Sequence, residues 1–184
     1  LHEIKVGSLP DMLVFTSDGK YLLVANEGEP TENYSVDPEG SVSIITIPKN
    51  IRAATVRNIY FKDLKPDGST KIYKGALSVA ADLEPEYITI AADNKTAVVC
   101  MQENNAFITI DIEKGMITDF YGLGYKNHQF AGNGLSTSDR NTQIQIKPRP
   151  VFGLYQPDAI TSITQNDKVY ILSANEGDIR KYHF

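Results

Sequence analysis

The sequence has few of the residues that build covalent cross-links or zinc sites. Its 184 residues include one cysteine, three histidines and no tryptophan. A single Cys100 excludes an intrachain disulfide, and His2, His128 and His183 do not have the spacing of zinc ligands. Cys100 lies in the apolar run 97–101, so we expect a buried, unreactive thiol rather than a reactive one.

An excess of positive charge, long apolar runs and catalytic signatures are also absent. Lysine and arginine total 18 against 23 acidic residues, a net charge of −5, which argues against a nucleic-acid partner. No apolar run approaches the roughly 18–20 residues that span a bilayer, so we expect no membrane span in this segment. The sequence holds no Gly-x-Ser-x-Gly, His-Glu-x-x-His or Cys-x-x-Cys motif. No signal peptide is visible, and the first residue is Leu1 rather than methionine.

A repeat organises the chain. Three segments begin with a proline followed by an acid, at Pro10-Asp11, Pro85-Glu86 and Pro157-Asp158, and the prolines are 75 and 72 residues apart. Each segment continues with an alternating strand, an Asp-containing turn and a second apolar strand. Each second strand ends in a polar Asn-Glu or Gln-Glu signature. Such a repeated hairpin predicts a repetitive all-β architecture.

The repeat predicts a β-propeller of four-stranded antiparallel blades. Third strands are expected over residues 42–47 and 106–112, fourth strands over 55–61 and 116–121, and an outer strand over 3–7. No amphipathic helix of ten residues is expected. A sandwich, a jelly roll and a solenoid are the competing architectures. About two and a half blades are present, so we expect a fragment of a longer ring: blade one at about 8–61, blade two at about 83–121, an insertion at 122–150 and a half blade at 151–184.

Several motifs in one order carry a resemblance that covers nearly the whole chain. They are DGKYLLVANEGEP at 18–30, VDPEGSVSI at 36–44, GNGL at 132–135, PVFGLYQPDAI at 150–160 and SANEGD at 173–178. Together they resemble the choice-of-anchor I domain family, whose members include proteins labelled mesenchyme-specific cell surface glycoprotein or alkaline phosphatase. The resemblance implies a seven-bladed, YVTN-like propeller in an extracellular or cell-surface setting, and no defined reaction. Residues 136–141 and 179–184 are less acidic than in the family, which weakens a metal site in those two loops.

Propeller topology predicts an acidic mouth, by which we mean the end of the central channel where the first strands of the blades begin. The first strand of a blade lines the channel, and the loops between second and third strands emerge on the same face as the blade connections. We therefore expect oxygen ligands for calcium to converge there. The metal-ligand candidates are Asp11, Glu27, Glu86, Glu103, Asp158 and Glu176, and the ligand-binding candidates are Asn26, Gln102, Asn104 and Asn175. The alternative is that the acids cap turns and the amides bond their own backbone.

Two loops differ in the sign of their charge. Residues 27–39 carry five acids and no base; this loop is a solvated acidic loop, a calcium loop or a docking patch for a basic partner. The insertion 122–150 carries four basic residues against Asp139. Arg140 in this insertion is a further ligand-binding candidate. The insertion could hold a phosphate over the mouth, or it is a plain surface loop.

The predicted function follows from the repeat, the acidic face and the missing nucleophile. We expect a non-enzymatic extracellular or cell-surface module for binding, adhesion or matrix contact, stabilised by calcium. Its partner would be an extracellular protein, a glycan, the matrix or the remaining blades of the ring. Two N-glycosylation acceptors, Asn33 and Asn94, fit secretion. The alternative is a metal-dependent phosphoesterase or lactonase-like hydrolase that uses the acidic mouth.

Overall fold

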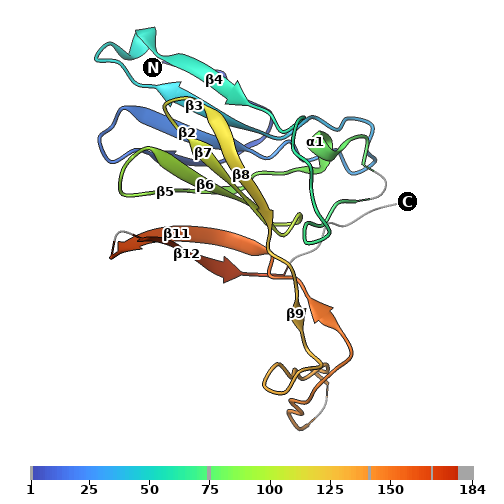
Figure 1. The fold of residues 1–184 in the computed structure, drawn as a ribbon. Coiled ribbons are helices and arrows are strands. Elements are labelled where there is room, and N and C mark those ends of the chain that lie inside the picture. Colours follow the sequence, from blue (N-terminus) through green and yellow to red (C-terminus); the bar gives the residue numbers. More distant parts are fainter. Residues whose placement is uncertain (1, 74–75, 141, 167, 178–184) are drawn as a thin grey trace.

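The computed structural model describes residues 2–73, 76–140, 142–166 and 168–177, and their structure is almost wholly β (Figure 1). Residues 179–184, where the sequence departs from the acidic pattern of the family, lie outside these ranges. Besides the 3₁₀ turn η1 (Ile51–Ala53) and the short helix α1 (Val79–Asp82), the elements are the strands β1 (Pro10–Phe15), β2 (Tyr21–Asn26), β3 (Ser41–Thr46), β4 (Thr55–Ile59), β5 (Tyr87–Ile90), β6 (Thr96–Met101), β7 (Ala106–Asp111), β8 (Met116–Gly122), β9 (Lys126–Asn127), β10 (Phe152–Gly153), β11 (Pro157–Gln165) and β12 (Lys168–Asn175).

The strands form two complete four-stranded meanders and the first hairpin of a third. One antiparallel sheet has the order β1-β2-β3-β4, the next has the order β5-β6-β7-β8, and β11 pairs with β12. The small β9–β10 ladder closes the base of the insertion. This confirms the prediction of an all-β fold built from four-stranded antiparallel blades, about two and a half of which are present. The number of blades in a complete ring stays a prediction.

The tight turns follow from their residues. In the β1–β2 turn, Asp18 accepts hydrogen bonds from the Thr16 hydroxyl and the Lys20 amide at 2.7 and 3.1 Å. Gly19 then adopts a φ of 70°, which favours glycine. In the β5–β6 turn, Asp93 accepts from the Lys95 amide at 2.8 Å and Asn94 takes the left-handed conformation. An acid followed by glycine or asparagine therefore makes the same hairpin in both blades.

The first strands of the three units lie next to one another. β5 contacts β1 and β2 of the first sheet on one side and β11 of the third unit on the other. Figure 1 shows the two sheets and the β11–β12 hairpin as successive layers. Adjacent innermost strands are the arrangement that places first strands around a propeller channel.

Two apolar clusters hold these layers together. The larger lies between the two four-stranded sheets and contains Leu23, Ile44, Phe61, Val99 and Ile108, all at most 1% exposed. The smaller joins the second sheet to the hairpin through Val98, Cys100 and Ile160. Because β6 contributes to both clusters, almost every residue of that strand is buried. Burial raises the pKa of the Cys100 thiol to about 12, so the thiol is the unreactive group that the sequence predicted.

The outer strand expected over residues 3–7 does not form. Within the described residues this segment has no antiparallel partner for its backbone groups. It instead approaches the end of β2 and β3, where a Cβ on Gly7 would lie 2.3 Å from Ser41 Oγ. Neither short helix of the described ranges is long and apolar enough to cross a bilayer.

Side-chain hydrogen bonds connect the two sheets at their periphery. Arg57 of β4 donates to the carbonyls of Ile112, Glu113 and Lys114 in the β7–β8 turn, at 2.8–3.0 Å. At that turn the guanidinium leaves no room for a side chain on Gly115, whose φ is 61°. A second tie joins Ser17 to Asn94 at 2.8–3.1 Å. Both sets of hydrogen bonds join the first blade to the second.

Replacing Arg57 with alanine should weaken the contact between the blades. The variant loses three charge-assisted hydrogen bonds that are partly open to solvent, so we expect the free energy of unfolding to fall on the order of 1 kcal/mol. Urea unfolding would measure the change. Arg52→Ala is the matched control, because no side-chain bond of Arg52 occurs within the described ranges. Equal losses in both variants would contradict the role given to Arg57.

Candidate functional site

Two of the predicted mouth acids lie at matching irregularities. The ladder between β1 and β2 steps from Pro10–Asn26 to Met12–Ala25 and leaves Asp11 without a partner. The ladder between β11 and β12 steps from Pro157–Asn175 to Ala159–Ala174 and leaves Asp158 without one. A bulge re-aims the side chain of its extra residue. In both units, the aspartate of the Pro-Asp dipeptide is therefore the unpaired residue of a bulge.

The residue before each of these two prolines has an unusual backbone conformation. Leu9 has a φ of 49° and Gln156 a φ of 45°. The carbonyl of Leu9 accepts from the Glu27 amide at 2.8 Å, and that of Gln156 accepts from the Glu176 amide at 3.1 Å. The same bond thus places a second acid beside the bulge in both units. Sequence reasoning missed this feature, because leucine and glutamine do not favour positive φ.

The second unit buries its acid more deeply. Glu86 is 8% exposed, and its amide donates to the carbonyl of Cys100 at 3.1 Å. The pKa of Glu86 lies far above its ordinary value of 4.5, first because burial removes water from the carboxylate. A hydrogen bond with Glu103 and the negative charges of Glu103, Glu27 and Glu84 raise it further. Burial and the neighbouring carboxylates therefore favour the protonated form of Glu86 over the charged one.

The remaining acids interact across the units. Burial, and then the charge of Asp158, raises the pKa of Asp11. Gln102 donates to the Glu176 carboxylate at 3.0 Å, which connects the end of β6 to the end of β12. Among the six predicted metal ligands, Asp11 thus interacts with Asp158, and Glu86 interacts with Glu103 and Glu27. No three His, Cys, Asp or Glu side chains lie close enough to hold one metal ion within the described ranges. Their role as calcium ligands stays a prediction.

Two of the predicted ligand-binding amides are buried and hydrogen-bonded within the protein. Asn104 is 1% exposed: it accepts from the Glu84 amide and donates to carbonyl oxygens of Lys71 and Asp82 at 2.8–3.1 Å. Asn26 is 0% exposed and donates to Ser41 and Ser43. Neither has surface to offer a ligand. Asn175 is exposed and accepts from the Ser173 hydroxyl.

Asn105 is a positioning residue that the sequence did not reveal. It is fully buried with a φ of 52°. Its side-chain oxygen accepts from the amides of Tyr155 and Gln156 at 2.9 and 3.1 Å, and its nitrogen donates to the carbonyl of Gly124 at 2.8 Å. The residue therefore joins blade two to both ends of the insertion. Its tolerance for positive φ was the available signal.

The insertion extends away from the described sheets (Figure 1), and its predicted role as a phosphate clamp stays a prediction. We call residues 122–153 the arm; Figure 1 shows the arm extending away from the sheets. Arg140 is exposed, and its backbone amide donates to Ser138. Its predicted role as a ligand-binding residue at the mouth stays a prediction.

The two predicted glycosylation acceptors lie in different surroundings. Asn33 is exposed, and its side-chain oxygen accepts from the Ser35 amide at 3.1 Å. Asn94 is half-buried, and its side chain is bonded to Ser17 of the neighbouring blade. A glycan on Asn33 would extend freely into solvent, whereas one on Asn94 would adjoin the contact between blades. Both sites stay predictions.

Replacing Glu86 with glutamine should stabilise the fold when no cation is bound, and increasingly so at higher pH. The folded state keeps the proton that the unfolded state releases above pH 4.5, so the stability of the unmodified protein falls as pH rises from that value. Glutamine keeps a donor for Glu103 without this loss. Thermal unfolding in EDTA should show no difference near pH 4 and a growing difference toward pH 8. The exposed Glu39→Gln is the control; a Glu86→Gln effect independent of pH would contradict the account.

Comparisons with known proteins find a similar solved structure and a matching family model. A solved structure titled "Kuenenia stuttgartiensis Hydrazine Synthase" is similar at 13% identity and a TM-score of 0.49; the match covers 93% of this chain and 47% of the other. The chain thus spans about half the length of that protein. A search of curated proteins finds no match. The family model described as "Choice-of-anchor I domain" matches residues 1–184, and the chain therefore belongs to the choice-of-anchor I domain family.

Proposed function

We propose that this chain is part of a non-enzymatic extracellular or cell-surface propeller. In this proposal the mouth contacts an extracellular protein, a glycan or the matrix, and calcium occupies the mouth when it does so. The observation that carries the proposal is the repeated placement of acids at the mouth. Asp11 and Asp158 lie at matching bulges, and Glu27 and Glu176 are held by the same backbone bond. Membership of a family named for its anchor supports the surface setting.

The electrostatics of the mouth favour a cation as the ligand. Asp11 lies within the field of Asp158, and Glu86 lies within the fields of Glu103, Glu27 and Glu84. Carboxylates in such positions repel one another when they are ionised, and the repulsion is removed by a proton or by a cation. Calcium accepts six to eight oxygen ligands in flexible geometry, so it is the cation that we propose for these carboxylates.

The side chains near the mouth support a binding role over a catalytic one. Cys100 is fully buried and its pKa is raised, so it is a poor nucleophile. His128 lies on the arm, where its Nδ1 is 2.6 Å from the carbonyl oxygen of Asn133. The arm, which carries the basic residues of the insertion, extends away from the sheets (Figure 1). A phosphoesterase would need a positive group beside its metal to hold the phosphate.

Saturating calcium should raise the thermal stability of the chain relative to EDTA. Calcium at about 100 times its dissociation constant would stabilise the folded state by about 2.7 kcal/mol. Glu86→Gln and Glu103→Gln should remove most of this gain, whereas the exposed Glu39→Gln should keep it. An unfolding temperature that is unchanged by calcium would contradict calcium binding and leave the acids as groups that position turns.

Hydrolysis of phosphomonoesters and lactones should be undetectable with or without calcium. The reason is that the predicted mouth residues within the described ranges are carboxylates and amides, and a nucleophile paired with a base is not among them. A screen of both substrate classes would check this. An activity that Glu103→Gln abolishes while folding is kept would overturn the non-enzymatic proposal in favour of the metal-dependent hydrolase.

A further inference from the structure

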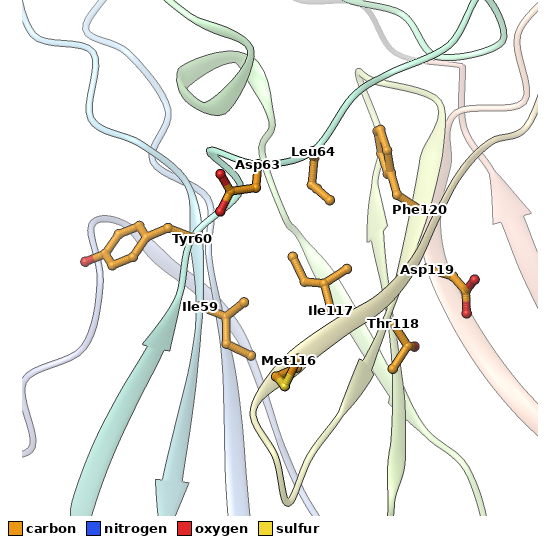
Figure 2. Close-up of a pocket in the computed structure, with 9 residues that line it drawn as sticks. All are labelled: Ile59, Tyr60, Asp63, Leu64, Met116, Ile117, Thr118, Asp119 and Phe120. Atoms are coloured by element: carbon orange, nitrogen blue, oxygen red, sulfur yellow. The ribbon is translucent and has the colours of Figure 1, made fainter.

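A groove lies at the outer rim, between the last strands of the two complete blades. It has a volume of about 410 Å³ and is lined from β4 to β8 by Ile59, Tyr60, Asp63, Leu64 and residues 116–120. Figure 2 shows Ile59, Leu64 and Ile117 around the space, with Asp63 at its upper end. Pockets of this size with mostly apolar walls and few polar groups are common binding sites.

The charge and the edges of the groove restrict what fits it. The charged lining residues are Asp63 and Asp119, and the lining contains no base. β4 and β8 are each the terminal strand of their sheet within the described ranges. β8 also carries a bulge at Thr118, between the pairs Thr109–Asp119 and Ile110–Ile117. An extended segment with aliphatic side chains and a positive charge matches this chemistry, because a free edge accepts a further strand.

The arm presents a segment of that kind. Residues 142–147 read TQIQIK, in which Ile144 and Ile146 alternate with glutamines and a lysine follows. Ile144 is 84% exposed and Ile146 is 71% exposed. Of the five large hydrophobic residues more than 60% exposed within the described ranges, four lie on the arm: Phe130, Ile144, Ile146 and Phe152. Such a concentration marks an interaction surface rather than scattered apolar exposure.

The arm is also ordered without burying these side chains. Arg149 donates its amide to the carbonyl of His128 at 2.9 Å, Asn133 donates to the carbonyl of Asn127 at 3.0 Å, and Leu135 bridges Lys147. None of the four basic residues of the arm forms an ion pair within the described part of the chain. A preformed element with unpaired positive charge and exposed isoleucines loses little conformational entropy on binding.

We propose that the arm of one copy of this protein docks into the β4–β8 groove of another copy. Ile144 and Ile146 enter the apolar groove, and Lys147 lies beside Asp63. Figure 1 shows the arm extending away from β4 and β8 of its own chain, which favours contact between copies. The two surfaces differ, so association takes place either by reciprocal exchange of arms between two copies or by a head-to-tail contact that builds larger oligomers.

Analytical ultracentrifugation of the chain tests this proposal. We expect a mass that rises with protein concentration and falls with added salt. Ile144→Ser with Ile146→Ser, Lys147→Glu alone and Asp63→Lys alone should each weaken association by about tenfold or more. Combining Lys147→Glu with Asp63→Lys should restore it, because the opposite charges face each other again. Each altered side chain is exposed, and circular dichroism verifies that every variant folds.

Two matched variants control for unspecific effects. Leu77→Ser removes a side chain that is 80% exposed outside the arm, and Glu29→Lys reverses an exposed acid in the 27–39 loop; both should leave association unchanged. A protein that stays monomeric at every concentration overturns the proposal, as does a charge exchange that fails to restore association. A monomer that binds anionic vesicles through the same isoleucines would also overturn it and assign the arm to a membrane.

Discussion

The contact of β5 with β1 on one side and β11 on the other is the constraint on which the rest of the structure depends. These are the first strands of three successive units, and each begins at or just after a proline followed by an acid. Their packing therefore brings residues about 75 positions apart in the chain to one end of the blades. It also buries acids and brings like charges together, so the same contact that builds the core raises the pKa of Glu86 and of Asp11.

The fold separates two kinds of surface along the blades. The inner strands carry the acids, whereas the outer strands β4 and β8 carry the apolar groove and the bonds from Arg57 to the neighbouring turn. Stability that is lost through repulsion at the mouth is offset by the apolar clusters between the layers and by the ties at the rim. A ligand at the mouth and a second copy at the rim would consequently occupy different parts of the molecule.

The sequence predicted the blades well because their signals are local. Apolar alternation marked the strands, and Asp18-Gly19 and Asp93-Asn94 marked the hairpins, as the observed ladders confirm. The positive φ of Leu9 and Gln156 was not predictable, because it is imposed by tertiary bonds to Glu27 and Glu176 rather than by residue preference. The role of Asn26 and Asn104 stayed open in the sequence for a related reason: an amide after a strand serves a turn or a ligand equally well. The direction of the arm depends on Asn105, whose partners are 19 to 51 positions away.

Measurement of the individual glutamate pKa values by carbon-13 NMR titration of the side-chain carboxyl groups tests the central claim most directly. In calcium-free buffer we expect Glu86 to keep its proton far above its ordinary pKa of 4.5. Added calcium at neutral pH should then displace the proton of Glu86. Titration of Glu86 near its ordinary value of 4.5 would contradict the account, because the acids of the mouth would then not be buried against one another.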